Sequence, residues 1–216
     1  MSINQKNKMA PYVSGGLVVL NILLFLLCTF EGDLLYNKGG LSPYYFFEEK
    51  EYYRIFTSMF LHGDASHLTN NMLLLFGLGA MIEKEVGHIS FGVLYFLTGL
   101  GGNVASLCFK LITGELSVIS IGASGAVFGL IGVLLVLTLM PSVEIPNATP
   151  VRILLVIGYS IYCGMSESNI DNAAHVGGVL CGILFSIVWF GIFHKGLFKK
   201  KVQQSREIED GGYYED

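Results

Sequence analysis

The sequence predicts an all-α, polytopic membrane protein that crosses the bilayer with six helices. Composition is the first observation behind this prediction: of 216 residues, 52% are hydrophobic and 14% are charged, whereas soluble domains carry about 25% charged residues. The second is that the hydrophobic residues gather in six separate segments. The third is that lysine and arginine flank these segments mainly where six crossings place them on one side of the membrane.

The six apolar segments approach the roughly 20 residues that a transmembrane helix needs. They are residues 11–30, 67–82, 89–111, 121–140, 151–165 and 173–193. The second and the fifth are the shortest, so we expect these helices to extend into flanking polar residues or to tilt less. No repeat relates one half of the chain to the other, which disfavours a transporter built from inverted repeats.

The segments define a simple domain organisation. We expect residues 1–10 to form a cytoplasmic N-terminal tail, residues 11–193 a single membrane domain, and residues 194–216 a cytoplasmic tail without fixed structure. Within the membrane domain, residues 31–66 are polar but rich in tyrosine and phenylalanine. This composition is typical of the lipid headgroup zone, so we expect the segment to lie in the membrane interface.

Basic residues indicate the orientation of the chain. They occur before the first segment, after the second, before the fifth and after the sixth, as Lys6, Lys8, Lys84, Arg152 and Lys195. The positive-inside rule makes this side the cytoplasm. We therefore expect an integral protein, of a bacterial plasma membrane, with both termini inside and the lipid bilayer as its surroundings.

Charge and cysteine content disfavour other classes of protein. The net charge is −4, and no basic stripe lies away from the membrane flanks, so we expect no nucleic-acid partner. The four cysteines lie in or beside apolar segments without metal-ligand spacing. We interpret them as packing residues, namely Cys28, Cys108, Cys163 and Cys181.

Polar side chains of three segments fall at one depth. Even-numbered segments begin on the outer side, and there His67 and Asn71 open the second, Ser124 opens the fourth, and Asn172 and His175 open the sixth. Polar groups in hydrocarbon are costly and usually functional. Their convergence predicts a site about one helical turn below the outer surface.

Ser124 lies in the motif Gly-Ala-Ser-Gly at residues 122–125. Gly122 and Gly125 allow the backbone to approach closely and a helix to begin there. The first amides of a helix have no partner within it, so they are available to stabilise an oxyanion. The motif alone is weak evidence, because small residues are common where transmembrane helices pack.

His175 shares a helix face with Gly178 and Gly182. The fourth segment carries a matching glycine face, made of Gly125, Gly129 and Gly132. Packing of the two faces would bring the Ser124 hydroxyl within hydrogen-bond reach of the imidazole, which is the nucleophile–base arrangement of acyl transfer. The alternative is glycine-mediated packing beside an incidental histidine.

Neighbouring residues would support such a pair. Phe128 follows Ser124 by one turn and could pack against the imidazole, although a lipid-facing or core position is the alternative. His67 and Asn71 are one turn apart and, with the amide of Ser124, could donate to a developing oxyanion.

We expect a serine–histidine dyad, because no carboxylate is an evident third member. Asp171 stands one turn before His175 but at the watery end, and Asn172 is another residue that could orient the imidazole. An aspartyl mechanism would need two intramembrane aspartates, and Asp171 alone lies near a span. A metal site at His62, His67 and His175 lacks the H-E-x-x-H motif, so we expect neither metal nor cofactor.

Together these motifs resemble the rhomboid intramembrane serine proteases. The resemblance covers residues 11–193 and rests on the serine motif at 122–125 and the histidine motif at 174–178 with Gly182. It also rests on His62, His67 and Asn71, which fit the family's second-span histidine and asparagine pattern. Tyr53–Arg54 occupies the place of the family's Trp-Arg pair, and Phe128 stands where a tyrosine is often found. These departures affect loop anchoring and imidazole packing.

The resemblance implies a six-helix bundle with a water-filled cavity open to the outer side. Ser124 would be the nucleophile, His175 the general base and then acid, and Ser124 N–H, His67 and Asn71 the oxyanion donors. Substrates would be single-pass membrane proteins, cut in or near their spans without metal or ATP. A non-cleaving binding protein of the same fold and a solute transporter are the rival interpretations.

Overall fold

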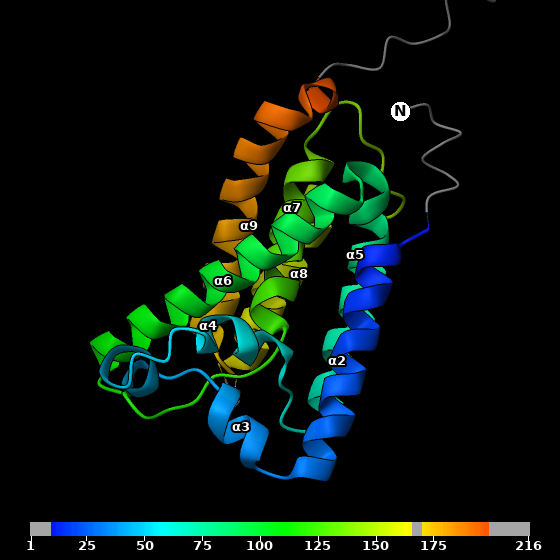
Figure 1. The fold of residues 1–216 in the computed structure, drawn as a ribbon. Helices are drawn as coiled ribbons and strands as arrows, with labels where there is room; N and C mark the ends of the chain where they lie inside the picture. Colours follow the sequence, from blue (N-terminus) through cyan, green and yellow to red (C-terminus); the bar gives the residue numbers. More distant parts are fainter. Residues whose placement is uncertain (1–9, 166–169, 199–216) are drawn as a thin grey trace, which may run out of the picture.

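The computed structural model describes residues 10–165 and 170–198, which form a bundle of helices (Figure 1). The elements are α2 (Tyr12–Glu31), α3 (Leu34–Gly39), η1 (Tyr44–Glu48), α4 (Arg54–Thr57), η2 (Ser58–Phe60), α5 (Ala65–Val86), α6 (His88–Thr113), α7 (Ser124–Thr138), α8 (Pro150–Gly164), α9 (Asn172–Phe193) and η3 (Lys195–Phe198). Apart from one isolated β-bridge, the regular structure of these residues is helical. The predicted all-α class is confirmed. Most of both predicted tails, residues 1–9 and 199–216, lies outside the described residues.

Six helices coincide with the six predicted segments, namely α2, α5, α6, α7, α8 and α9. By length and composition, α2, α6 and α9 could each cross a membrane, and α7 and α8 are apolar but shorter. α5 has 22 residues and extends the second segment into polar residues at both ends, as its short apolar stretch predicts. α8 has 15 residues and does not extend its segment.

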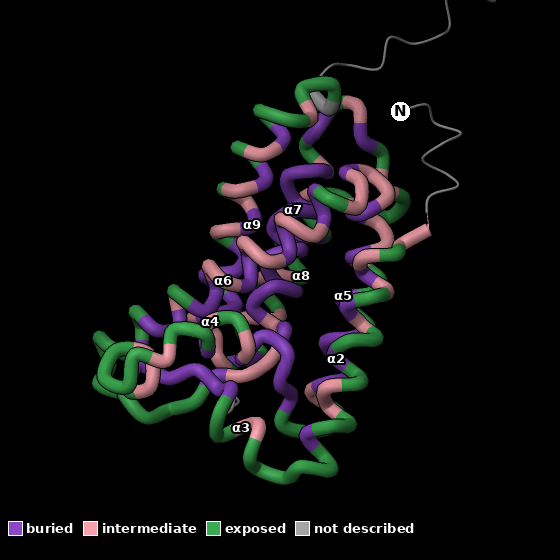
Figure 2. Tube along the Cα trace, in the orientation of Figure 1, coloured by how far each residue is buried: buried purple, intermediate pink, exposed green. Residues whose placement is uncertain are grey.

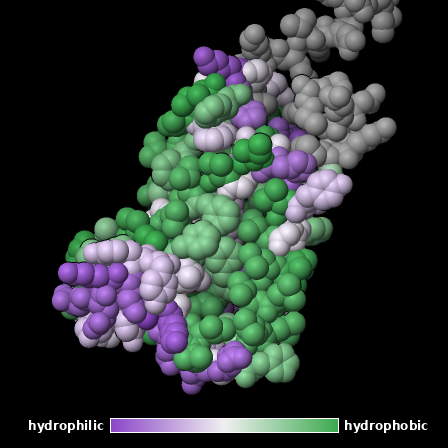
Figure 3. Space-filling model, in the orientation of Figure 1, coloured by the Kyte–Doolittle hydropathy of each residue, from purple (hydrophilic) through white to green (hydrophobic). Residues whose placement is uncertain are grey.

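α7 is the centre of the bundle. Every residue from Gly125 to Leu137 is buried, and α6 and α9 pack extensively against α7 and against each other. Figure 2 shows this buried helix surrounded by partly exposed ones. The outward residues of α2, α8 and α9 are large and apolar, as lipid-facing surfaces are. In Figure 3 hydrophobic residues cover most of the helical body, and hydrophilic ones gather in the loop region beside α4.

Glu83, near the end of α5, holds the start of α2. Its carboxylate accepts hydrogen bonds from the amides of Val13 and Ser14, at 2.9 Å each, and from the Ser14 hydroxyl at 2.8 Å. His88 Nδ1 lies 2.5 Å from the same carboxylate. The first amides of a helix need such partners, and a carboxylate is favourable at the positive end of the helix dipole. Glu83 is completely buried.

These contacts define the two ends of the bundle. At one end α2 begins and α5 ends, and the hydroxyl of Ser90 in α6 lies 2.9 Å from His194 Nε2 just after α9. Both ends of the described chain therefore lie at this end, the upper one in Figure 1. The opposite end carries the starts of α5, α7 and α9, so the three polar helix starts singled out by the sequence share one end of the bundle.

The long connection between α2 and α5 folds over this second end. Buried Arg54 holds it together, donating to Gly40 O at 2.8 Å and to Glu51 Oε2 at 2.5 Å, with its guanidinium carbon 3.9 Å from the centroid of the Tyr45 ring. Exposed aromatic side chains project from the connection, namely Tyr44, Phe47, Tyr52, Tyr53 and Phe56.

The connection is also joined to the segment that precedes α7. Leu41 and Ser120 exchange two backbone hydrogen bonds, of 3.0 and 2.7 Å. The amide of Gly122 donates to Ser58 O at 2.9 Å. The backbone before Ser124 is thus fixed by a distant part of the chain.

Candidate active site

Ser124 is the first residue of α7, directly after a break in the backbone. Gly122 has φ +121°, a conformation that side chains disfavour, and the first intrahelical bond runs from Val127 N to Ala123 O at 3.0 Å. The amides of residues 124–126 therefore have no carbonyl four residues earlier within the helix. Ser124 carries its hydroxyl at this end, beside N–H groups that can bind an anion.

His67 lies against the same glycine. A Cβ atom at Gly122 would sit 2.8 Å from both Cε1 and Nε2 of His67 and 3.7 Å from Ser124 Oγ. The imidazole of His67 in α5 therefore occupies space that a side chain at residue 122 would need, and the hydroxyl of Ser124 in α7 lies beside that space. Glycine is required here both for its backbone conformation and for the space that it leaves.

Asn71 follows one turn later on α5 and is almost fully buried. Its amide nitrogen donates to His67 O at 3.0 Å. A carboxamide carries two N–H donors, so one remains for another acceptor. Asp64 accepts from His67 N at 2.8 Å and caps this helix. The first turn of α5 is therefore held in place, with His67 and Asn71 on the same face.

His62 is a neighbour whose role sequence reasoning did not identify. Its Nε2 accepts from Ala123 N at 3.5 Å, and its ring centroid is 5.1 Å from that of His67. Burial, with a smaller contribution from the charge of His67, lowers the pKa of His62 to about 4. The ring is therefore neutral near pH 7 and can act as an acceptor. Among the residues described, no three His, Cys, Asp or Glu side chains are grouped so as to hold a metal ion.

The two glycine faces of α7 and α9 meet. A Cβ atom at Gly178 would overlap Gly125 O, and one at Gly182 would overlap Gly129 O. The backbones of α7 and α9 are therefore in direct contact, as small residues permit. Ser124 precedes Gly125 by one residue and His175 precedes Gly178 by one turn, so both stand at the same end of this contact.

The imidazole of His175 is stacked on Phe128. The ring centroids are 3.9 Å apart and the planes are inclined by 6°. His175 is 8% exposed, and its Nδ1 is buried without a hydrogen-bond partner among the described residues. Phe128 belongs to the turn of α7 that follows Ser124, so one helix carries both the hydroxyl and the ring beneath the imidazole.

Neither candidate orienter makes a hydrogen bond with Nδ1 of His175. Asp171 uses Oδ1 to accept from Ala174 N at 2.9 Å, and its Oδ2 faces Ser106 and Ser120 at 2.5 Å each. Asn172 lies instead against Gly164, where a Cβ atom would overlap its side chain.

Comparison with known protein families gives a match that spans most of the helices described above. A family model described as the rhomboid domain matches residues 49–192. The chain belongs to the rhomboid family. The matched residues run from α4 through most of α9, so every candidate site residue lies within the rhomboid domain, and the polytopic helical membrane fold is that of the family.

Curated relatives agree with this assignment. RHOMBOID-like protein 4 of Arabidopsis thaliana is 36% identical over 71% of this chain and 38% of its own length. The rhomboid protease GluP of Bacillus subtilis is 30% identical over 86% of this chain and 36% of its own. The rhomboid protease AarA of Providencia stuartii is 28% identical over 83% and 73%. The chain therefore spans little more than a third of the length of the first two relatives.

Proposed function

We propose that this rhomboid chain is an intramembrane serine protease that hydrolyses peptide bonds in or near the transmembrane segments of single-pass membrane proteins. The observation that carries the proposal is the backbone contact between α7 and α9, which sets Ser124 and His175 at one end of two touching helices. Two relatives that bear the name rhomboid protease support the same activity.

In this mechanism His175 takes the proton of the Ser124 hydroxyl as Oγ attacks the carbonyl carbon of the substrate. The imidazolium then gives the proton to the leaving amine, and a water molecule hydrolyses the acyl-enzyme by the same path. We assign the pair as a dyad, because Asp171 is occupied elsewhere and Nδ1 of His175 has no protein partner in the described residues. The Phe128 ring holds the plane of the imidazole.

We assign the oxyanion to three donors: the amide of Ser124, the ring N–H of His67 and the second N–H of Asn71. The position of His67 beside Gly122 and Ser124 supports this assignment. Donors of this kind act where negative charge develops, and the loss of one lowers kcat on the order of 10²–10³-fold. Gly122 contributes by leaving room for the His67 ring. No metal or cofactor takes part in the proposed chemistry.

The orientation is part of the proposal. The bundle end that holds Glu83, the start of α2 and the end of α9 would face the cytoplasm, and the end that holds Ser124 would open outward. Residues 1–10 and 194–216 would be cytoplasmic, residues 11–193 the membrane domain, and the connection at 31–66 interfacial, in a bacterial plasma membrane. The exposed aromatic side chains of that connection support the last assignment.

Replacement of either member of the pair tests the proposal. With a membrane-anchored reporter in proteoliposomes, Ser124→Ala and His175→Ala should abolish cleavage while the protein still inserts. A fluorophosphonate probe should label the unmodified chain and not Ser124→Ala. Ser117→Ala, which removes an exposed hydroxyl in the segment before α7, is the matched control and should cleave normally.

Two outcomes would contradict the proposal. Normal cleavage by Ser124→Ala or His175→Ala would refute the dyad. An unmodified chain that binds the reporter without cutting it would instead indicate a binding protein that shares the fold.

A further inference from the structure

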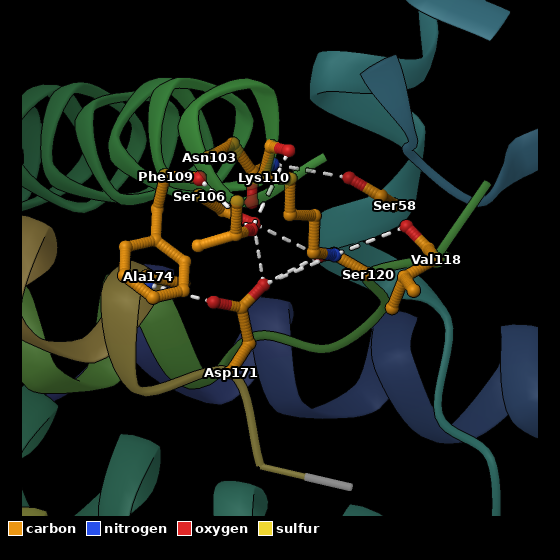
Figure 4. A network of polar contacts seen from close by, with 10 residues as sticks. Ser58, Asn103, Ser106, Phe109, Lys110, Val118, Ser120, Asp171 and Ala174 are labelled. Carbon is orange, nitrogen blue, oxygen red and sulfur yellow. Dashed lines mark hydrogen bonds and ion pairs between the residues drawn. The ribbon is translucent and has the colours of Figure 1, made fainter. Parts of the chain in front are cut away.

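A buried polar cluster joins three distant parts of the chain near the outer end of α6 (Figure 4). We call it the Asp171 cluster and define it as Ser106 and Lys110 of α6, Ser120 from the segment before α7, and Asp171 at the start of α9. Asp171 Oδ2 accepts from both serine hydroxyls at 2.5 Å, and the two hydroxyl oxygens are 3.0 Å apart.

Lys110 completes the cluster. Its Nζ donates to the hydroxyl of Ser120 and, at 3.1 Å, to Val118 O, and it lies 3.5 Å from Asp171 Oδ2. Figure 4 shows the lysine reaching along the cluster toward Ser120 and Val118, with the carboxylate facing it from α9.

Burying the charged and polar groups of the Asp171 cluster costs free energy, so its presence indicates a role that offsets this cost. Lys110 is 6% exposed, and Ser106 and Ser120 are 1% and 7% exposed. The side chain of Asp171 is 22% exposed, so it is mostly but not fully buried. A buried ion pair contributes little net stability compared with apolar residues of the same volume, because both charges lose their hydration. A role beyond simple packing therefore has to be sought in what the cluster connects.

Two of its members each stand four residues before a member of the catalytic pair. Ser120 precedes Ser124, and its backbone is paired with Leu41. Asp171 precedes His175, and it holds the first turn of α9 twice: Oδ1 accepts from Ala174 N at 2.9 Å, and its main-chain carbonyl accepts from His175 N at 3.1 Å. The hydrogen bond between Ser120 and Asp171 is thus a direct link between the segment that leads to the hydroxyl and the helix start that bears the imidazole.

We propose that Lys110, Ser120 and Asp171 are positioning residues that fix the placement of the Ser124 hydroxyl relative to the His175 imidazole. This role rests on the proposed protease function and deepens it. Lys110 holds Ser120 and Asp171 from α6, so that the two segments cannot slide apart along the glycine contact. A displacement of about 1 Å between reacting groups can lower the rate on the order of 10²-fold, so small movements at the cluster matter at the site.

The test separates the cluster from the helix cap. Asp171→Ser keeps a side chain that can cap α9, but the serine side chain is too short for its hydroxyl to reach Ser120 as well. Asp171→Asn keeps both the cap and the reach. We expect Asp171→Ser, Ser120→Ala and Lys110→Met to lower kcat about 10- to 100-fold with KM little changed, and Asp171→Asn to retain more activity than Asp171→Ser. Lys38→Met, which removes an exposed lysine of the same end, should leave kcat unchanged.

A double variant separates positioning from stability. Lys110→Met combined with Asp171→Ser removes both charges, so its melting temperature should recover relative to the single variants, since an unpaired buried charge costs more than an absent pair. The rate of Ser124 labelling by the fluorophosphonate and kcat should stay low. If both recover together with the melting temperature, the cluster is merely structural and the positioning role is overturned.

The two proposals fail in different ways. If the unmodified protein is active and the folded cluster variants have the same kcat, only the positioning role is overturned. Unmodified protein that neither cleaves the reporter nor is labelled overturns the protease function and the positioning role with it.

Discussion

The ring of Phe128 lies parallel to the imidazole of His175, with 3.9 Å between the ring centroids. Because Nδ1 of this imidazole has no hydrogen-bond partner in the described part of the chain, the stacked ring is the contact that sets the plane of the imidazole. Serine hydrolases of the triad type use a hydrogen-bonded carboxylate to orient their histidine, whereas in the proposed dyad the face of Phe128 would do so.

Phe128→Ala should therefore lower activity, and the lost burial of the ring should also lower the free energy of unfolding by about 3–5 kcal/mol. Loss of an aromatic pair removes about 0.5–1.5 kcal/mol beyond the burial of the ring, which corresponds to a decrease of about 2- to 13-fold in the population of correctly oriented imidazole. Reporter cleavage and fluorophosphonate labelling measure the effect. Phe128→Tyr keeps the stacked face and should remain active. Equal activity in the alanine and tyrosine variants would show that the stacking does not orient His175.

Gly178→Ala should separate α7 from α9. The added methyl group would overlap Gly125 O, a backbone atom that cannot rotate away, so we expect a destabilisation of about 1–3 kcal/mol and loss of cleavage. Gly191→Ala on the same helix is the matched control, since a Cβ there meets nothing within 4 Å. Thermal unfolding in detergent and reporter cleavage give the comparison. A Gly178→Ala protein as stable and active as the control would contradict the backbone contact.

Glu83→Ala should loosen the start of α2. The change leaves the amides of Val13 and Ser14 and the Ser14 hydroxyl without their acceptor, and an unsatisfied buried donor costs about 1–3 kcal/mol. Glu83→Gln keeps one acceptor oxygen and should lose less. Hydrogen exchange of the first turn of α2 reports the change directly, with Glu48→Gln, at an exposed position, as control. Unchanged protection in Glu83→Ala would refute the capping role.

His62 should make stability depend on pH. Burial lowers the pKa of the folded form of His62 to about 4, below the ordinary histidine value of about 6.5. Between these values the unfolded chain binds a proton that the folded chain does not, so the free energy of unfolding falls as the pH is lowered through this range. His62→Gln keeps an acceptor for Ala123 N–H but cannot titrate. Its melting temperature should fall less between pH 7 and pH 5 than that of the unmodified protein, and an identical fall would refute the prediction.

Much of the fold could be predicted from the sequence because its signals are local. The six apolar segments need only their own composition, and the glycine faces of α7 and α9 follow from helical periodicity. The apolar segment begins at residue 121, whereas α7 begins at Ser124, where the Gly-Ala-Ser-Gly motif predicts a helix start. The reason is non-local: Leu41 pairs with Ser120, and Ser58 accepts from Gly122 N, so the segment before Ser124 is held outside the helix.

The Asp171 cluster shows what sequence patterns do not reveal. From the sequence, Lys110 is interpreted as a solvated charge at the outer end of a transmembrane segment. Asp171 is interpreted either as a residue exposed to water at the start of the sixth segment or as a residue that orients His175. Only the packing of α6 against α9 brings them to opposite sides of Ser120. A lysine inside an apolar segment is itself a signal, because such a charge needs a partner, but the sequence does not name that partner.

The order of the helices along the chain has a consequence for biosynthesis. In the proposed mechanism α7 bears the nucleophile, whereas the imidazole is on α9, the last long helix among the residues that the structure describes. A nascent chain that has inserted α2 to α8 therefore exposes Ser124 without a base and without the glycine contact that would align it. Under the proposed chemistry the chain has no protease activity until α9 has entered the membrane and packed against α7. The membrane proteins of the translocation machinery that surround the growing chain are therefore not exposed to an active protease.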